Sequence, residues 1–99
     1  MISVKIHKSY RTVVAMCDSE LLGKKFEEGI RQLDVRTNFY NGEEVSEEKA
    51  LEIMQNYGIE DATFNIVGDN SVRLAIQAGI IGEESSAKIQ NIPFALKLL

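Results

Sequence analysis

A strand-to-helix turn in the second half of the chain carries the residue types that bind an anion. Asn65, Gly68 and Asp69 follow an apolar run, and Asn70 begins a segment with helical periodicity. Free N–H groups at a helix start attract anions, and a glycine lets a ligand approach the backbone. In the alternative reading, Gly68 only makes a tight turn, Asp69 or Asn70 caps the helix, and Asn65 ties a loop. A small-ligand or enzyme-like site at these four residues is one hypothesis.

Basic residues near the start of the chain predict a second kind of site, a surface for RNA or for a protein partner. They are Lys5, His7, Lys8 and Arg11, joined by Lys24 and Lys25. Lys5 and His7 share the outward side of an alternating strand, with Tyr10 in the turn that follows. Cations beside an aromatic residue can engage RNA phosphates and a stacked base. The alternative is that lysines on a strand simply face water and discourage aggregation.

The chain lacks a complete set of residues for catalysis or metal binding. His7 is the only histidine and Cys17 the only cysteine, which is too few for a typical zinc site. Four glutamates within residues 43–48 lack the spacing of a calcium loop, and no Ser-His-Asp pattern is present. Cys17 closes an apolar strand and is interpreted as buried and inert. We therefore predict no catalytic residue, no metal and no cofactor, and favour a non-enzymatic protein.

Composition and charge indicate one globular domain over residues 1–99. Hydrophobic residues make up 44% and charged residues 26%, which are ordinary values. The net charge is −4, but residues 1–36 carry seven Lys or Arg against five Asp or Glu, whereas residues 37–99 carry four against ten. This argues against a uniformly basic surface, so we expect no DNA partner. Apolar runs far shorter than the about 20 residues of a membrane span predict no membrane partner and a cytoplasmic location.

The elements that must position these residues begin with an antiparallel hairpin. Residues 2–7 alternate between apolar and polar, the period of a half-buried strand, and residues 12–17 return as a more buried one. Asp18 is predicted to cap a short helix over residues 19–22. A third strand is expected over residues 30–35.

The middle of the chain predicts two strand-helix units. Asn41 and Gly42 predict a tight turn with positive φ. Ser46 then caps a helix that ends at Gly58 and has an apolar stripe. A fourth strand over residues 62–67 and a helix over about residues 70–78 follow.

The last segment predicts one short strand and an apolar tail. The strand covers residues 87–91, and Pro93 argues against a long continuation at the centre of a sheet. The tail from Phe94 to Leu99 is too apolar to remain in water, so it packs back on the domain or meets another copy. The expected fold is α/β or α+β, a single compact domain. It has a mixed sheet of four to five strands, with an N-terminal hairpin followed by β-α-β-α-β.

Taken in order, these segments resemble a small archaeal family catalogued as a domain of unknown function, number 424. The likeness covers nearly the whole chain. Its most specific parts are the Cys-Asp-x-Glu-Leu-Leu-Gly-Lys run at residues 17–24 and the Asn-Ile-Val-Gly turn at residues 65–68. The family often ends in a Val-Pro-His-Ala motif, where this chain has Phe94 in place of the histidine, so any chemical role of that histidine is lost here. The resemblance implies an archaeal cytoplasmic protein of unassigned function.

The leading functional hypothesis is a non-enzymatic binding module, an RNA- or translation-associated adaptor or a partner of another protein. Lys5, His7, Lys8, Arg11, Lys24 and Lys25 would make the contacts. Two alternatives remain open: the small-ligand or enzyme-like site at the turn that follows Asn65, and a homo-oligomeric structural protein assembled through the tail.

Overall fold

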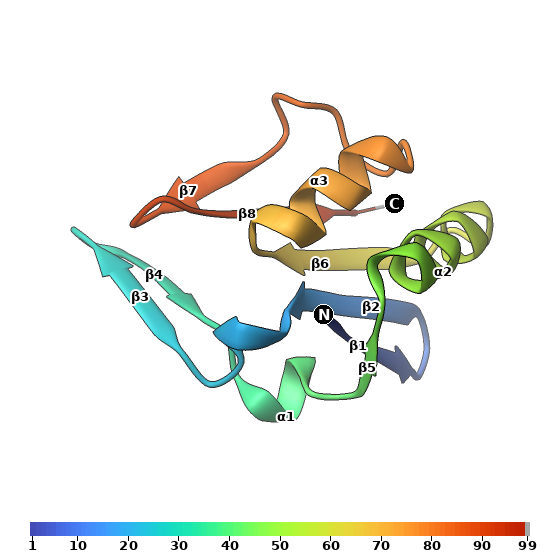
Figure 1. Cartoon of the computed structure of the whole chain (residues 1–99), viewed down its shortest axis with the longest axis horizontal. Coiled ribbons are helices and arrows are strands. Elements are labelled where there is room, and N and C mark those ends of the chain that lie inside the picture. The colour runs from blue at the N-terminus through green and yellow to red at the C-terminus, as the bar shows by residue number, and fades with distance from the viewer. Residues whose placement is uncertain (99) are drawn as a thin grey trace.

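A six-stranded mixed sheet forms the centre of the protein, shown in Figure 1 as a computed structural model that describes residues 1–98. In spatial order the strands are β5 (Glu43–Val45), β1 (Ile2–Lys8), β2 (Thr12–Asp18), β6 (Thr63–Val67), β8 (Ile92–Lys97) and β7 (Ala87–Ile89). Only the β2–β6 pair is parallel among these neighbours. The predicted fold class is confirmed. The sheet has six strands rather than four or five because β5 is too short to show an alternating pattern and because residues 94–97, expected as part of a tail, belong to β8.

Three α-helices and a separate hairpin complete the fold. The helices are α1 (Thr37–Tyr40), α2 (Glu47–Ile59) and α3 (Asp69–Gln77), and the hairpin pairs β3 (Lys25–Glu28) with β4 (Arg31–Asp34). A 3₁₀ turn, Ser19–Leu21, follows β2. Within residues 1–98, no helix is long and apolar enough to cross a membrane.

The two faces of the sheet carry two separate hydrophobic clusters. Val4, Met16 and Ile66 lie on one face because they are register partners in β1, β2 and β6, and they pack with α2 and α3. Cys17 and Val67 lie on the opposite face. Figure 1 shows α3 beside β6 and β8, whereas α1 lies below β1. The sheet is therefore covered by α2 and α3 on one face, and by α1 and the β3–β4 hairpin on the other.

Most of the local predictions are confirmed. The β1–β2 hairpin forms as expected, and Ser46 caps α2 by accepting a hydrogen bond from the Lys49 N–H at 3.1 Å. The α2 helix runs one residue past Gly58, to Ile59. The strand predicted over residues 30–35 forms as β4, but it pairs with an unpredicted strand, β3, outside the main sheet. Gly29, with φ of +64°, turns the chain, and the residues before it pair with β4 as β3.

The backbone geometry predicted for Asn41 and Gly42, a tight turn with positive φ, is wrong. Asn41 has φ of −80°, and Gly42 is not among the residues with positive φ. A Cβ at Gly42 would overlap the carbonyl oxygen of Val4. The glycine is needed because the chain passes close against β1, not because it turns.

Pro93 lies inside the sheet, contrary to the prediction. It is the second residue of β8, which runs between β6 and β7. Its carbonyl accepts a hydrogen bond from the Gly68 N–H at 2.8 Å. The carbonyl of Gly68, which would have accepted from the missing proline N–H, instead accepts from the Val72 N–H at 2.9 Å. The proline therefore leaves no backbone group unsatisfied.

Candidate functional site

The start of α3 is closed by an aspartate from the neighbouring strand. The carboxylate of Asp18 accepts hydrogen bonds from the N–H of Asn70 at 3.1 Å and from the N–H and hydroxyl of Ser71, both at 2.8 Å. These N–H groups have no partner inside the helix and form the positive end of its dipole. Asp18 makes no side-chain hydrogen bond to the 3₁₀ turn after it, so its predicted role as a local cap is wrong. It occupies the position that an anionic ligand would take.

Gly68 is required at this junction for two reasons. Its φ is +113°, a conformation that side chains other than glycine rarely adopt. In addition, a Cβ at this position would lie 2.7 Å from Oδ2 of Asp18. The glycine therefore allows close contact with a carboxylate of the chain itself.

The other residues of the predicted turn site do not converge. Asn65 lies in the middle of β6, on the same face as its register partners Ala15 and Leu96. Asp69 is exposed. The side-chain oxygen of Asn70 accepts a hydrogen bond from Nη2 of Arg73 at 3.1 Å. The structure thus brings Gly68 and Asn70 together around Asp18 and leaves Asn65 apart.

Three alternate side chains of β1, all on the sheet face that carries α1, form hydrogen bonds with the C-terminal end of that helix. The hydroxyl of Ser3 donates to the Tyr40 carbonyl, Nζ of Lys5 donates to the Asn38 carbonyl, and Nε2 of His7 donates to the Phe39 carbonyl, each at 2.8 Å. The His7 ring stacks on the Phe39 ring, with centroids 4.6 Å apart. Carbonyls at a helix C-terminus lack intrahelical partners and favour cations. Lys5 and His7 therefore have a structural role in addition to any role in binding.

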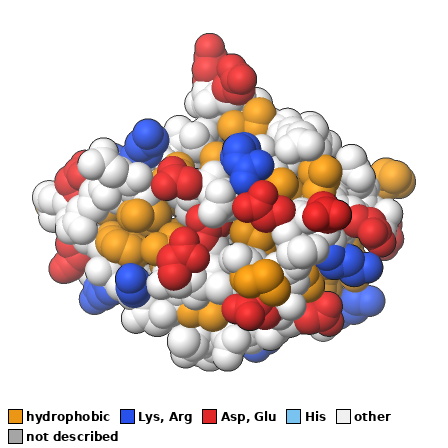
Figure 2. All heavy atoms as spheres, viewed as in Figure 1, with side chains coloured by type: hydrophobic (Ala, Val, Ile, Leu, Met, Phe, Trp, Pro, Cys, Tyr) orange, Lys and Arg blue, Asp and Glu red, His pale blue; other side chains and the backbone are white. Residues whose placement is uncertain are grey.

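The turn between β1 and β2 presents the remaining residues of the first basic group. Lys8 and Arg11 are exposed, and Tyr10 between them is 99% exposed. The ion pairs among residues 1–98 are Lys49–Glu52 and Arg73–Glu47, so neither cation has an acidic partner in the described part of the chain. Figure 2 shows Lys or Arg side chains at the right-hand edge of the molecule, over this turn, with acidic side chains beside them.

Lys24 and Lys25 lie apart from the other four basic residues. They follow the 3₁₀ turn after β2, and Lys25 is the backbone register partner of Asp34 in the β3–β4 hairpin. The β1–β2 turn is at the opposite end of β2, and seven strand residues span about 20 Å. The structure therefore brings together Lys5, His7, Lys8 and Arg11, but not all six residues.

Cys17 and Tyr40 are buried in the second hydrophobic cluster. Burial, followed by the negative charges of Asp18 and Glu20, raises the pKa of the Cys17 thiol to about 12. Burial also raises the pKa of Tyr40 to about 12. Phe94 packs against the same cluster. At neutral pH the thiol is therefore neutral and enclosed, which is a poor state for a nucleophile.

A cavity of about 410 Å³, which no sequence pattern predicted, lies between the C-terminal ends of α2 and α3. Its lining includes Asp61 after α2, Phe64 in β6, Ile80 after α3 and Lys97 in β8. These residues are far apart in the sequence and belong to no motif. A glycine near the end of each helix was the one local signal. In the part of the chain that the structure describes, no group of three His, Cys, Asp or Glu side chains could hold a metal ion.

Comparison with known proteins identifies relatives without an assigned activity. A family model described as "Protein of unknown function (DUF424)" matches residues 6–98, which confirms the resemblance seen in the sequence. No curated protein matches the chain. The crystal structure of an uncharacterized conserved protein from Methanopyrus kandleri is similar, with a TM-score of 0.86 and 22% identity, over 96% of this chain and 88% of that one. At this identity the likeness shows the fold alone.

Proposed function

The chain belongs to the DUF424 family of proteins of unknown function, and on this premise we propose that it is a non-enzymatic module that binds single-stranded RNA at the β1–β2 turn. The observation that carries the proposal is the pair of exposed cations, Lys8 and Arg11, without an acidic partner among residues 1–98. They flank Tyr10, whose ring is 99% exposed. Phosphates would pair with the cations, and an unpaired base would stack on the ring.

The side chains that could take part in catalysis are hydrogen-bonded to other parts of the fold or buried, which supports binding rather than catalysis. The carboxylate of Asp18 accepts hydrogen bonds from the start of α3, and one ring nitrogen of His7 forms a hydrogen bond with a carbonyl of α1. The Cys17 thiol is buried. We also propose a cytoplasmic location, which is consistent with this single free thiol.

A salt titration of RNA binding tests the proposal. Fluorescence anisotropy would follow a labelled single-stranded oligonucleotide at two salt concentrations. Each phosphate contact contributes a slope of about −0.7 in log K against log salt, so contacts with Lys8 and Arg11 predict about sevenfold weaker binding between about 50 and 200 mM salt. The double variant Lys8→Gln/Arg11→Gln should lose most of this dependence. Tyr10→Leu should weaken binding at both salt concentrations, whereas Tyr10→Phe should not.

The matched control is Lys24→Gln/Lys25→Gln, which removes the same charge at the distant hairpin. This variant should bind RNA like the unmodified protein. If it loses as much affinity as the β1–β2 variant, the attraction is not located at the turn and the proposal is wrong. Absence of salt-dependent binding at low salt would also contradict it.

Self-association through β8 is a second candidate, which the open edge of that strand favours. The β7–β8 ladder ends at Phe94. The carbonyl of Pro93 accepts a hydrogen bond from the Gly68 N–H, so the backbone polar groups of residues 93, 95 and 97 point toward β6. The backbone groups of Leu96 therefore point to the opposite edge of β8. The side chains of Leu96 and Leu98 are 55% and 63% exposed. An unpaired edge with exposed leucines is a surface on which a second strand can pair. Leu99, the last residue of the predicted tail, lies outside the described residues.

Light scattering with Leu96→Glu tests self-association. A dimer of the full chain that becomes a monomer in this variant supports the candidate. Ile30→Glu is the control, because Ile30 is likewise an exposed apolar residue but lies at the tip of the β3–β4 hairpin. A monomeric full chain at high concentration would exclude assembly through β8.

A further inference from the structure

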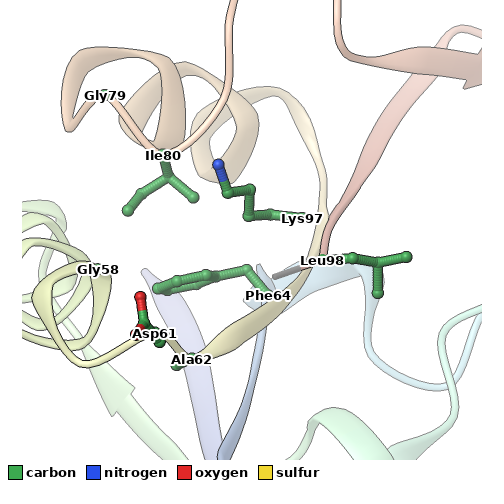
Figure 3. A pocket seen from close by; sticks show the side chains of 8 residues that line it. All are labelled: Gly58, Asp61, Ala62, Phe64, Gly79, Ile80, Lys97 and Leu98. Carbon is green, nitrogen blue, oxygen red and sulfur yellow. The ribbon is translucent and has the colours of Figure 1, made fainter.

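The cavity between the ends of α2 and α3 combines an apolar floor with one group of each charge. Figure 3 shows the ring of Phe64 across its base, with the carboxylate of Asp61 on the α2 side and the ammonium of Lys97 toward α3. Ile80 lies above the ring. The volume of about 410 Å³ is in the range of small-molecule sites, about 300–1,000 Å³. Such a combination suits a small zwitterion that also carries an apolar group.

The two charges do not neutralise each other. The ion pairs within 4.0 Å among residues 1–98 do not include Asp61 or Lys97. Asp61 and the exposed Glu60 follow the C-terminal end of α2, and the last turn of α2 has no basic residue. The negative end of a helix with added carboxylates favours a cation. The α2 side of the cavity is therefore suited to an ammonium group.

The apolar part of the cavity is preformed. Phe64 and Ile80 are 1% and 7% exposed, so their positions are held by the core rather than by a ligand. Gly58 lies against Ile80, and a Cβ there would come within 2.8 Å of Ile80 Cδ1. Asp61 has φ of +58°, an uncommon conformation that fixes the direction of the turn carrying the carboxylate. A rigid apolar floor reduces the entropy cost of binding.

We propose that this cavity binds a free α-amino acid with a large apolar side chain. The ammonium group of the ligand faces Asp61, its carboxylate faces Lys97, and its side chain packs on Phe64 and Ile80. This site is separate from the RNA surface and uses none of its residues. The inference goes beyond the proposed RNA binding and does not depend on it.

Nuclear magnetic resonance titration of the full chain with phenylalanine tests the site. Amide signals of Ala62, Phe64 and Ile80 should shift in a saturable way. Phenylalaninamide lacks the carboxylate and N-acetylphenylalanine lacks the ammonium group, so each should bind about tenfold more weakly. Glycine, which lacks the side chain, should cause no shift at these residues.

Charge variants identify which end of the ligand meets which residue. Asp61→Asn should abolish the preference for phenylalanine over N-acetylphenylalanine, and Lys97→Gln should abolish the preference over phenylalaninamide. The variants Asp69→Asn and Lys88→Gln make the same charge changes outside the cavity and should leave both preferences intact. Gly58→Leu, which adds a side chain to the cavity lining against Ile80, should abolish binding. Absence of saturable shifts with phenylalanine, or equal binding of the three compounds, would overturn the proposal.

Discussion

At its N-terminal end α3 meets the carboxylate of Asp18, whereas at its C-terminal end it borders the cavity lined by Asp61 and Lys97. The first end is closed, because the aspartate accepts hydrogen bonds from two free N–H groups, those of Asn70 and Ser71, and from the Ser71 hydroxyl. The second end presents two charges that no ion pair among residues 1–98 neutralises. Polar groups that satisfy each other hold a fold together, whereas polar groups left open beside an apolar floor are available to a ligand. Substitutions at the two ends should therefore have different consequences.

The largest effect is expected from Gly68→Ala at the closed end. The added methyl group would overlap the Asp18 carboxylate, and the alanine backbone would have to adopt a φ of +113°. The combined strain should lower the free energy of unfolding by about 4 kcal/mol. Chemical denaturation measures this change. In an Asp18→Ala background the same substitution should cost less, because the clash is removed. Equal costs in the two backgrounds would show that the two residues do not interact.

The substitution Asp18→Ala should have the next largest effect, about 3 kcal/mol. It leaves the N–H groups of Asn70 and Ser71 without an acceptor at a buried helix start. Hydrogen exchange of these two amides should accelerate. The exposed Asp69 provides the control, since Asp69→Asn should change stability by only about 0.5 kcal/mol. Similar losses in the two variants would mean that the charge, and not the hydrogen bonding, matters.

A third prediction extends the comparison to α1, whose C-terminal end is also closed by side chains. Ser3 is buried, and its hydroxyl both donates to the Tyr40 carbonyl and accepts from the Gly42 N–H. Ser3→Ala should lower stability by about 1.5 kcal/mol, because the buried Tyr40 carbonyl and the partly buried Gly42 N–H lose their partner. Thermal unfolding measures the change. A neutral result would indicate that water replaces the hydroxyl.

Alkaline pH should destabilise the protein through the second hydrophobic cluster. The pKa values of Cys17 and Tyr40 are raised from 9.0 and 10.0 to about 12 in the folded state. The unfolded chain therefore loses protons first, and the stability present below pH 9 is lost as the pH rises toward 12. Cys17 alone should account for about 1 kcal/mol between pH 9 and 10. Denaturation curves of Cys17→Ala should show a smaller loss over this interval.

The smallest effect on stability is expected at the open end of α3. Asp61→Asn and Lys97→Gln remove charges of exposed residues outside any ion pair among residues 1–98. Each should change the free energy of unfolding by at most about 0.5 kcal/mol. Denaturation of both variants beside Asp18→Ala tests the comparison directly. A loss as large as that of Asp18→Ala would show that the cavity is a structural feature.

Local patterns predicted much of the fold but little of the closed junction. The alternation in β1 and the cap at Ser46 depend on neighbouring residues, and both are confirmed. The role of Asp18 depends on α3, which begins about 50 residues later, so the sequence suggested only the helix immediately after it. The strand role of Pro93 likewise depends on the hydrogen bond to Gly68. Long-range pairing, which short sequence windows do not contain, decides these positions.

The candidate surface shows the same division. The exposed cations Lys8 and Arg11 were predictable, because a hairpin turn places its residues in water. The bonds of Lys5 and His7 to α1 were not, since α1 has only four residues and no apolar periodicity. The cavity residues were not predictable either, because four separate elements supply them.

The position of β8 between β6 and β7 has a consequence for synthesis of the protein. β7 pairs with β8 only, so it has no partner in the sheet until the later strand has been translated. Until then β6 is an edge strand of the sheet, and the side of it that later pairs with β8 is exposed. The nascent chain therefore completes its sheet only after residues 92–97 have left the ribosome. Premature termination before these residues would leave an aggregation-prone edge rather than a smaller stable protein.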